Sequence, residues 1–261
     1  IPWLFLAIGI LTKGPVAFII IFTTLFSFLL THKNWKKLLF KINPGKGLLI
    51  TFFISSPWYF IQFLNYGNVF WDNFFGYHNL KRYTTTVNNH GESWWFYFFI
   101  LILASLPFSI FLIHGIIDTF KELIKKFETR SENSNSLYIF SLCWLISVFI
   151  FFSFSATKLP SYWIPAIPAA SILITRSAQT LITKRGNISL IWILTTFILF
   201  GFSIAFYFSD SWLVLINDPE MPDLANQIKI NGLILRSKLF FTFLAIISTI
   251  FIFKFSPKSL L

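Results

Sequence analysis

The chain has 261 residues, of which 56% are hydrophobic and 21% aromatic, while only 12% are charged. Its apolar residues gather in blocks of about 18 or more, roughly the length that a hydrocarbon layer about 30 Å thick requires. This composition excludes an ordinary water-soluble domain and predicts a polytopic membrane protein.

The apolar blocks predict a succession of membrane-spanning helices. In chain order they cover 1–12, 15–31, 47–64, 95–115, 137–154, 160–175, 189–208 and 238–254. The first block begins at Ile1, without an initiator methionine, so we expect the chain to be a fragment preceded by further sequence. The prediction is an all-α polytopic membrane protein with seven complete spans and one truncated span. These spans form a single membrane domain over 1–261, with no soluble domain.

The charged residues divide unequally between the two sides of the membrane. If the spans alternate, the segments 32–46, 116–136, 176–188 and the C-terminal tail share one side and hold 14 of the 21 lysines and arginines. Six of the ten carboxylates fall on the other side. The positive-inside rule makes the basic side cytoplasmic. The net charge of +11 therefore indicates attraction to anionic lipid head groups rather than to nucleic acid.

The connecting segments include two long outer loops, 65–94 and 209–237, a length that is usually functional or disordered. The second contains the acidic run Asp218–Asp223, which we interpret as a solvated loop rather than a cation site. On the inner side, apolar residues recur at helical spacing over 116–130, which predicts an amphipathic connecting helix in the membrane interface. The single Cys143 lies in an apolar block, so no disulfide forms within the chain.

The first cationic feature of the predicted outer side is Lys13, followed by Gly14 and Pro15. Gly14 permits a turn, and Pro15 starts the next helix at its first position. Lys13 is then held at a helix N-terminus, where free backbone N–H groups suit an anion such as phosphate. The alternative is a lysine that extends its charge to water from a span end.

The second feature is Arg82, which lies in an aromatic stretch of the first outer loop. Its planar guanidinium can bind a phosphate, and the Tyr83 hydroxyl can assist. The alternative is an interfacial aromatic belt whose cations meet lipid phosphates without specificity. His78 and His90 lie twelve residues apart in the same loop, a spacing that matches no compact metal site. We therefore predict no metal site, although the sequence leaves a divalent cation open as a cofactor.

The third feature is the run Lys158-Leu159-Pro160-Ser161-Tyr162 between two apolar blocks. A charge at this depth costs a few kcal/mol unless it reaches the interface or finds an anionic partner, so it marks a candidate functional site. If Pro160 starts a helix, Lys158 and Tyr162 converge on one ligand.

Several of these motifs occur together, in the same order and spacing, in one known family. They are Leu11–Pro15, Ser56–Tyr59, Phe74–Tyr77 with Arg82-Tyr83, Trp94–Tyr97 with Leu106–Ser109, and Lys158–Tyr162 with Pro165 and Pro168. Over positions 1 to about 175 the chain resembles the bacterial dolichyl-phosphate-mannose-protein mannosyltransferase-like family. This family includes the aminoarabinose transferase of lipid A.

The resemblance implies an integral-membrane glycosyltransferase of the GT-C architecture in the bacterial inner membrane. Such an enzyme transfers a sugar from a polyprenyl-phosphate donor to an acceptor on the periplasmic side, which is lipid A, a protein or another glycan. The catalytic aspartate of these enzymes lies in their first outer loop, which we expect to precede Ile1. In the aminoarabinose transferase a Glu-His pair precedes the arginine, whereas this chain has His78-Asn79 there.

The hypothesis for the site is that the outer cations bind the donor phosphate. The residues assigned to the phosphate are Lys13, Arg82, Lys158 and Tyr162, and those assigned to an acceptor or loop site are His78, Tyr83 and His90. Two alternatives remain open: a secondary transporter, whose sites also use broken helices and intramembrane charges, and a noncatalytic lipid-binding membrane protein.

Overall fold

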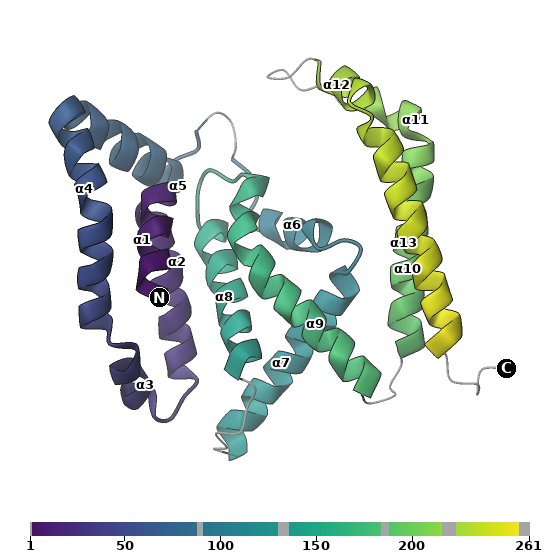
Figure 1. Cartoon of the computed structure of the whole chain (residues 1–261), viewed down its shortest axis with the longest axis horizontal. Coiled ribbons are helices and arrows are strands. Elements are labelled where there is room, and N and C mark those ends of the chain that lie inside the picture. Colours follow the sequence, from purple (N-terminus) through teal and green to yellow (C-terminus); the bar gives the residue numbers. More distant parts are fainter. Residues whose placement is uncertain (1, 88–90, 130–135, 184–187, 216–222, 256–261) are drawn as a thin grey trace. The chain divides into compact units, whose positions relative to one another are not determined.

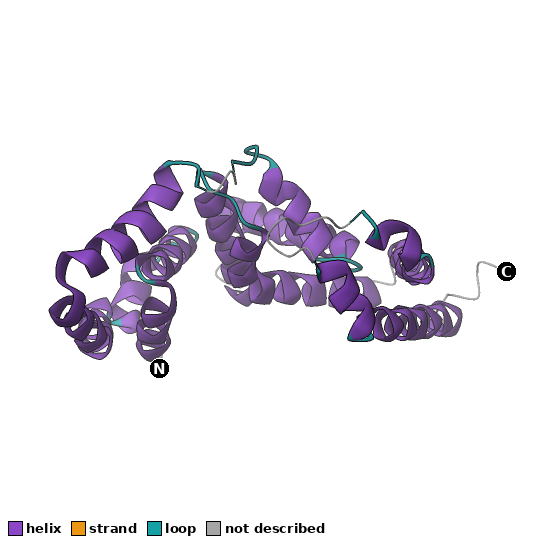
Figure 2. Ribbon diagram, turned by 90° about the horizontal axis from the view of Figure 1, so that it is seen from above, coloured by secondary structure: helices purple, strands orange, loops and turns teal. Residues whose placement is uncertain are grey.

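The computed structural model describes residues 2–87, 91–129, 136–183, 188–215 and 223–255. Within these ranges the chain forms helices and loops and no strand (Figures 1 and 2), which confirms the predicted all-α class. The residues group into two compact units. One comprises Ile1–Ala104 and Leu112–Arg176, and the other comprises Ser105–Phe111 and Ser177–Leu261. The single membrane domain stays a prediction.

The helices follow the apolar blocks of the sequence. In chain order they are α1 (Pro2–Lys13), α2 (Pro15–Leu30), α3 (Trp35–Ile42), α4 (Pro44–Trp71), the π-helix η1 (Asp72–Lys81), α5 (Arg82–Thr84), α6 (Phe96–Ala104), α7 (Ser109–Thr129), α8 (Ser136–Ser153), the 3₁₀-helix η2 (Pro160–Ala166), α9 (Ile167–Thr183), α10 (Ile188–Tyr207), α11 (Ser209–Leu213), α12 (Leu224–Ile230) and α13 (Leu233–Phe255).

The membrane class is supported by helix length and by exposed apolar surface. Four of the described helical stretches are long and apolar enough to cross a membrane: Trp35–Thr84, Ser136–Ser153, Leu190–Tyr207 and Leu233–Phe253. A fifth arises if α6 and α7, bent by 112°, count as one span. Phe53 and Leu64 of α4 are 69% and 66% exposed, as lipid-facing side chains are. The count of seven complete spans and one truncated span remains a prediction.

Two segments differ from the sequence-based expectation. The block 95–115, predicted as one span, is broken between α6 and α7, where Pro107 lacks the N–H that a continuing helix requires. α7 then runs on through most of the amphipathic segment 116–130. Much of the predicted outer loop 65–94 is helical, since α4 continues past a kink at Gly67 into η1 and α5.

Aromatic side chains pack η1 against α4. Phe70 and Phe74 stack on each other with their centroids 5.4 Å apart, and both contact the Trp58 ring edge-on at 5.8 and 6.1 Å. Each such ring contact stabilises the packing beyond the effect of burying the ring surface. The C-terminal part of α4 is thereby joined to η1.

The core of the first unit lies where α2, α6, α8, η2 and α9 meet. Its members include Ile20, Tyr97, Leu145, Trp163 and Leu173, all at most 6% exposed. Trp163 comes from η2, so the segment that follows Lys158 is anchored in this core.

The second unit is built on α10 and α13, which lie side by side (Figure 1). The Phe206 and Phe241 rings stack between them, with centroids 5.4 Å apart. Hydroxyl pairs also join the two helices, with Thr196 Oγ1 2.5 Å from Ser248 Oγ. Interhelical hydroxyl hydrogen bonds of this kind stabilise helix pairs in lipid.

We predict that Gly115→Ala destabilises the first unit. A methyl group at Gly115 of α7 would lie 2.1 Å from the backbone carbonyl oxygen of Leu173 in α9, so the helices would have to separate. Overpacking of this kind costs about 1–3 kcal/mol. Thermal unfolding of the purified protein in detergent should show a lower midpoint. The matched control is Gly201→Ala in α10, where a methyl group meets nothing within 4 Å; an equal loss in both variants would contradict the prediction.

Candidate functional site

The break between α1 and α2 has the predicted form. Lys13 is the last residue of α1, Gly14 has φ +65°, and Pro15 is the first residue of α2. A methyl group at Gly14 would lie 2.9 Å from the Phe74 ring of η1, so this turn packs directly on η1. The exposed Lys13 is also at the C-terminus of α1, where backbone carbonyls favour a cation.

The π-helix η1 carries the polar residues that precede Arg82. Asn79 Nδ2 donates a 2.6 Å hydrogen bond to the carbonyl of Phe74, which satisfies a backbone acceptor inside the wide helix. His78 is exposed and meets the Tyr77 ring edge-on. Lys81 Nζ lies 5.2 Å from the centroid of the same ring. π-helical turns are rare and occur frequently at functional sites.

Arg82 belongs to a segment, 82–87, that is hydrogen-bonded to the segment 155–158. We call these two segments together the loop clamp. Its backbone hydrogen bonds run from Ala156 N–H to the Tyr83 carbonyl (2.8 Å) and from Thr157 N–H to the Arg82 carbonyl (3.0 Å).

The Thr157 hydroxyl completes the clamp. It accepts a 3.0 Å hydrogen bond from the Val87 N–H and donates a 2.9 Å hydrogen bond to the Thr85 carbonyl. Thr157 is 2% exposed, so these bonds are shielded from water and the groups they satisfy would otherwise be costly to bury. The clamp therefore fixes the backbone of Arg82 next to that of Lys158.

The two cationic side chains of the loop clamp differ in their hydrogen bonding. Lys158 is 7% exposed, and its Nζ donates a 2.7 Å hydrogen bond to the Ser155 carbonyl, which leaves two of its three N–H donors. The Nε of Arg82 is buried and has no hydrogen-bond partner. Among the described residues no carboxylate forms an ion pair with Lys13, Arg82 or Lys158. The two side chains thus keep positive charge without a carboxylate ion pair and have N–H donors that no described residue uses.

Tyr97 contacts the backbone of Leu159, next to Lys158, and Tyr162 follows four positions after Lys158. The Tyr97 hydroxyl donates to the Leu159 carbonyl at 3.0 Å and accepts from the Leu159 N–H at 3.2 Å. Pro160 begins η2, as predicted, and places the half-buried Tyr162 ring on Phe152 with centroids 4.8 Å apart.

The structure thus joins two of the predicted site residues through their backbones. Arg82 and Lys158 are held together by the loop clamp, and Tyr162 follows Lys158 in η2. Lys13 stands at a turn that packs on η1, which leads into Arg82. Tyr83 stacks on Phe151 with centroids 5.1 Å apart.

Other predicted features fall partly outside the described residues, as do His90 and positions 218 to 222 of the acidic loop. In the described part of the chain, no three His, Cys, Asp or Glu side chains are grouped to hold a metal ion. Near the acidic loop, Lys229 Nζ donates a 2.7 Å hydrogen bond to Asp210 and lowers the pKa of that carboxyl. Both groups are exposed, so the pair stabilises the fold little.

Two residues important for the site were not singled out from the sequence. Tyr97 ends the Trp94–Tyr97 motif and Thr157 directly precedes Lys158, but their hydrogen bonds span about 60 to 70 positions. The only local signal was a polar residue next to a long apolar block. Their partners depend on how the helices pack.

Comparisons with known proteins identify relatives over most of the chain. A protein of Aquifex aeolicus without an assigned activity is 30% identical over 172 residues, which cover 66% of this chain and 36% of that protein. The undecaprenyl phosphate-alpha-4-amino-4-deoxy-L-arabinose arabinosyl transferase of Erwinia tasmaniensis is 29% identical over 176 residues, covering 66% and 30%. The enzyme of the same name from an Enterobacter species is 26% identical over 190 residues, covering 72% and 32%.

These relatives confirm the resemblance to the aminoarabinose transferases that the motifs indicated. The chain spans about a third of the length of the curated relatives it matches. No family model matches the chain, and no solved structure gives a significant match.

We predict that the loop clamp fails without the Thr157 hydroxyl. Thr157→Val keeps the side-chain shape but leaves the Val87 N–H and the Thr85 carbonyl without their partner, which costs about 1–3 kcal/mol. Limited proteolysis should then cut within 82–87 faster than in the wild-type protein. Thr157→Ser keeps the hydroxyl and serves as the control; equal protection of 82–87 in all three proteins would contradict the prediction.

Proposed function

We propose that this chain is part of an integral-membrane glycosyltransferase that takes a sugar from a polyprenyl-phosphate donor and passes it to an envelope acceptor. The observation that supports this most lies at Arg82, whose side-chain Nε is buried without a hydrogen-bond partner and whose backbone carbonyl accepts a hydrogen bond from the Thr157 N–H, next to Lys158. A phosphate accepts hydrogen bonds from both kinds of cation, and Arg binds it bidentately.

In this proposal Arg82 and Lys158 bind the donor phosphate, Tyr162 donates a hydrogen bond to it, and Lys13 adds positive charge from the α1–α2 turn. The acceptor oxygen attacks the anomeric carbon of the sugar, and the bond from that carbon to the phosphate oxygen breaks. The polyprenyl phosphate leaves with the electron pair, and the acceptor's proton passes to a general base that is not among the residues assigned here. Fixed cations stabilise the charge that develops on the leaving phosphate, which is often a large term in catalysis.

The names of the relatives narrow the choice of donor. Relatives are named as transferases that use an undecaprenyl phosphate-linked aminoarabinose, so we propose an undecaprenyl-phosphate sugar as the donor. We propose a lipid acceptor of the lipid A type at the periplasmic face of the bacterial inner membrane. Protein mannosylation, which the family resemblance also allowed, finds no support in these names.

We predict that Arg82→Ala in the full-length enzyme raises the KM for the donor and lowers transfer. A hydrogen bond to a charged group contributes about 1.5–3 kcal/mol, so kcat/KM for an undecaprenyl-phosphate-linked sugar should fall roughly 10- to 100-fold. The measurement is radiolabelled sugar transfer in reconstituted vesicles.

The matched control is Lys81→Ala, which removes the neighbouring cation that lies over Tyr77 and should leave kcat/KM near the wild-type value. An unchanged donor KM in Arg82→Ala would refute the phosphate role. Donor binding without any transfer by the wild-type protein would favour the noncatalytic lipid-binding alternative.

We also predict a smaller effect for Tyr162→Phe. The variant keeps the ring stacking on Phe152 but lacks the hydroxyl that we propose donates a hydrogen bond to the phosphate. A neutral hydrogen bond contributes about 0.5–1.5 kcal/mol, so kcat/KM should fall roughly 2- to 10-fold while the thermal unfolding midpoint stays unchanged. A fall in the midpoint that accounts for the lost activity would assign Tyr162 to packing alone.

A further inference from the structure

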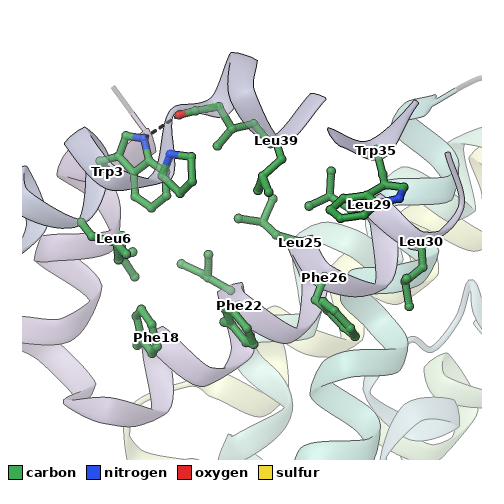
Figure 3. Close-up of a pocket in the computed structure, with 14 residues that line it drawn as sticks. Trp3, Leu6, Phe18, Phe22, Leu25, Phe26, Leu29, Leu30, Trp35 and Leu39 are labelled. Atoms are coloured by element: carbon green, nitrogen blue, oxygen red, sulfur yellow. Dashed lines mark hydrogen bonds between the residues drawn. The ribbon is translucent and has the colours of Figure 1, made fainter. Parts of the chain in front are cut away.

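A groove of about 470 Å³ runs between α1, α2, α3 and α4 of the first unit (Figure 3). Its walls are apolar side chains from all four helices, including Trp3, Phe22, Leu25, Leu39 and Leu48. The volume falls within the roughly 300–1,000 Å³ of small-molecule sites. The Trp3 Nε1–H is already bonded to the Ile42 carbonyl at 3.2 Å, so this indole adds no free donor to the walls.

The groove extends away from the donor site along α2. Its walls reach Leu29 and Leu30 at the C-terminal end of this helix, whereas Lys13 and Pro15 stand at the opposite end. At 1.5 Å per residue, Leu29 is about 20 Å along the axis from Pro15. A ligand head group at the α3 end is therefore separate from a phosphate bound by Arg82 and Lys158.

The short helix α3 closes this end of the groove and is strongly amphipathic. Trp35, Leu39 and Ile42 line the groove, while Lys36 and Lys37 are exposed. Lys36 Nζ lies 5.7 Å from the centroid of the Trp35 ring. This contact places a cation at the mouth of an apolar groove.

The charge around α3 is uncompensated. Positions 31 to 46 contain five lysines and no aspartate or glutamate, and among the described residues none of these lysines forms an ion pair. Clustered lysines next to membrane helices attract anionic lipid head groups, and each lysine raises the affinity by about tenfold or less. A single amphiphile with an apolar tail and a negatively charged head group would complement both the apolar groove and the lysines beside it.

We propose that the groove binds one molecule of an anionic glycerophospholipid. An acyl chain lies in the groove, and the lipid phosphate is held by Lys36 and Lys37 at its mouth. The site is separate from the proposed donor site and does not depend on the proposed transfer reaction.

The test is native mass spectrometry of the full-length protein in detergent, titrated with dioleoyl-phosphatidylglycerol or dioleoyl-phosphatidylcholine. The wild-type protein should retain one phosphatidylglycerol more tightly than phosphatidylcholine, which has the same acyl chains. Lys36→Gln/Lys37→Gln should lower the affinity for phosphatidylglycerol about 10- to 30-fold and leave the affinity for phosphatidylcholine unchanged. The matched control Lys121→Gln/Lys125→Gln removes the same charge from α7 and should change neither.

Three outcomes would overturn the proposal. The first is that the wild-type protein shows no preference for phosphatidylglycerol over phosphatidylcholine. The second is that both double variants lose phosphatidylglycerol affinity equally. The third is one-for-one displacement of phosphatidylglycerol by undecaprenyl phosphate, which would make the tail of the donor lipid the occupant. Leu25→Trp, which fills the groove, should weaken both phospholipids alike. The surface lysine variants keep the test decisive if Leu25→Trp does not fold. Arg82→Ala should leave phosphatidylglycerol binding unchanged, so failure of the donor site and failure of this site are distinguishable.

Discussion

The docking of residues 155–158 on residues 82–87 is the interaction on which the candidate site depends. Backbone groups at the membrane must find partners within the protein, because lipid offers none and each unsatisfied group costs several kcal/mol. Two irregular segments about 70 positions apart meet this requirement by bonding to each other, with the buried Thr157 hydroxyl between them. As a result the backbones of Arg82 and Lys158 are brought together.

Arg82 differs from another arginine of the first unit in having no carboxylate ion-pair partner among the described residues. Elsewhere in the same unit the chain neutralises an arginine internally, since Arg176 pairs with Glu122 and lies 4.7 Å from the centroid of the Tyr138 ring. Arg82 has no such carboxylate. A site that holds positive charge without an internal counterion binds an anion more strongly than one that must first break an ion pair. The resemblance to transferases that use undecaprenyl-phosphate donors agrees with an anion of this type.

The two proposed lipid sites use positive charge differently. At the loop clamp, buried hydrogen bonds fix the positions of Arg82 and Lys158, which suits the stabilisation of charge as a bond to phosphate breaks. On α3 the lysines are exposed on flexible stems, which suits retention of a head group without chemistry. α2 connects the two regions, with Pro15 at one end and Leu29 at the other. Buried backbone hydrogen bonds next to the cations, rather than net charge, distinguish the candidate reaction site from the candidate structural lipid site.

The sequence by itself determined the helical membrane class, most helix positions and the family resemblance, because apolar block length and Pro and Gly placement are local signals that the bilayer makes decisive. It also identified Lys13, Arg82, Lys158 and Tyr162 as unusual residues, since charge is costly near lipid. Only the tertiary structure decided that Arg82 adjoins Lys158, that Thr157 and Tyr97 hold them there, and that the segment after α4 is helical. Those outcomes rest on hydrogen bonds and ring contacts between residues far apart in the chain, and no local pattern specifies such partners.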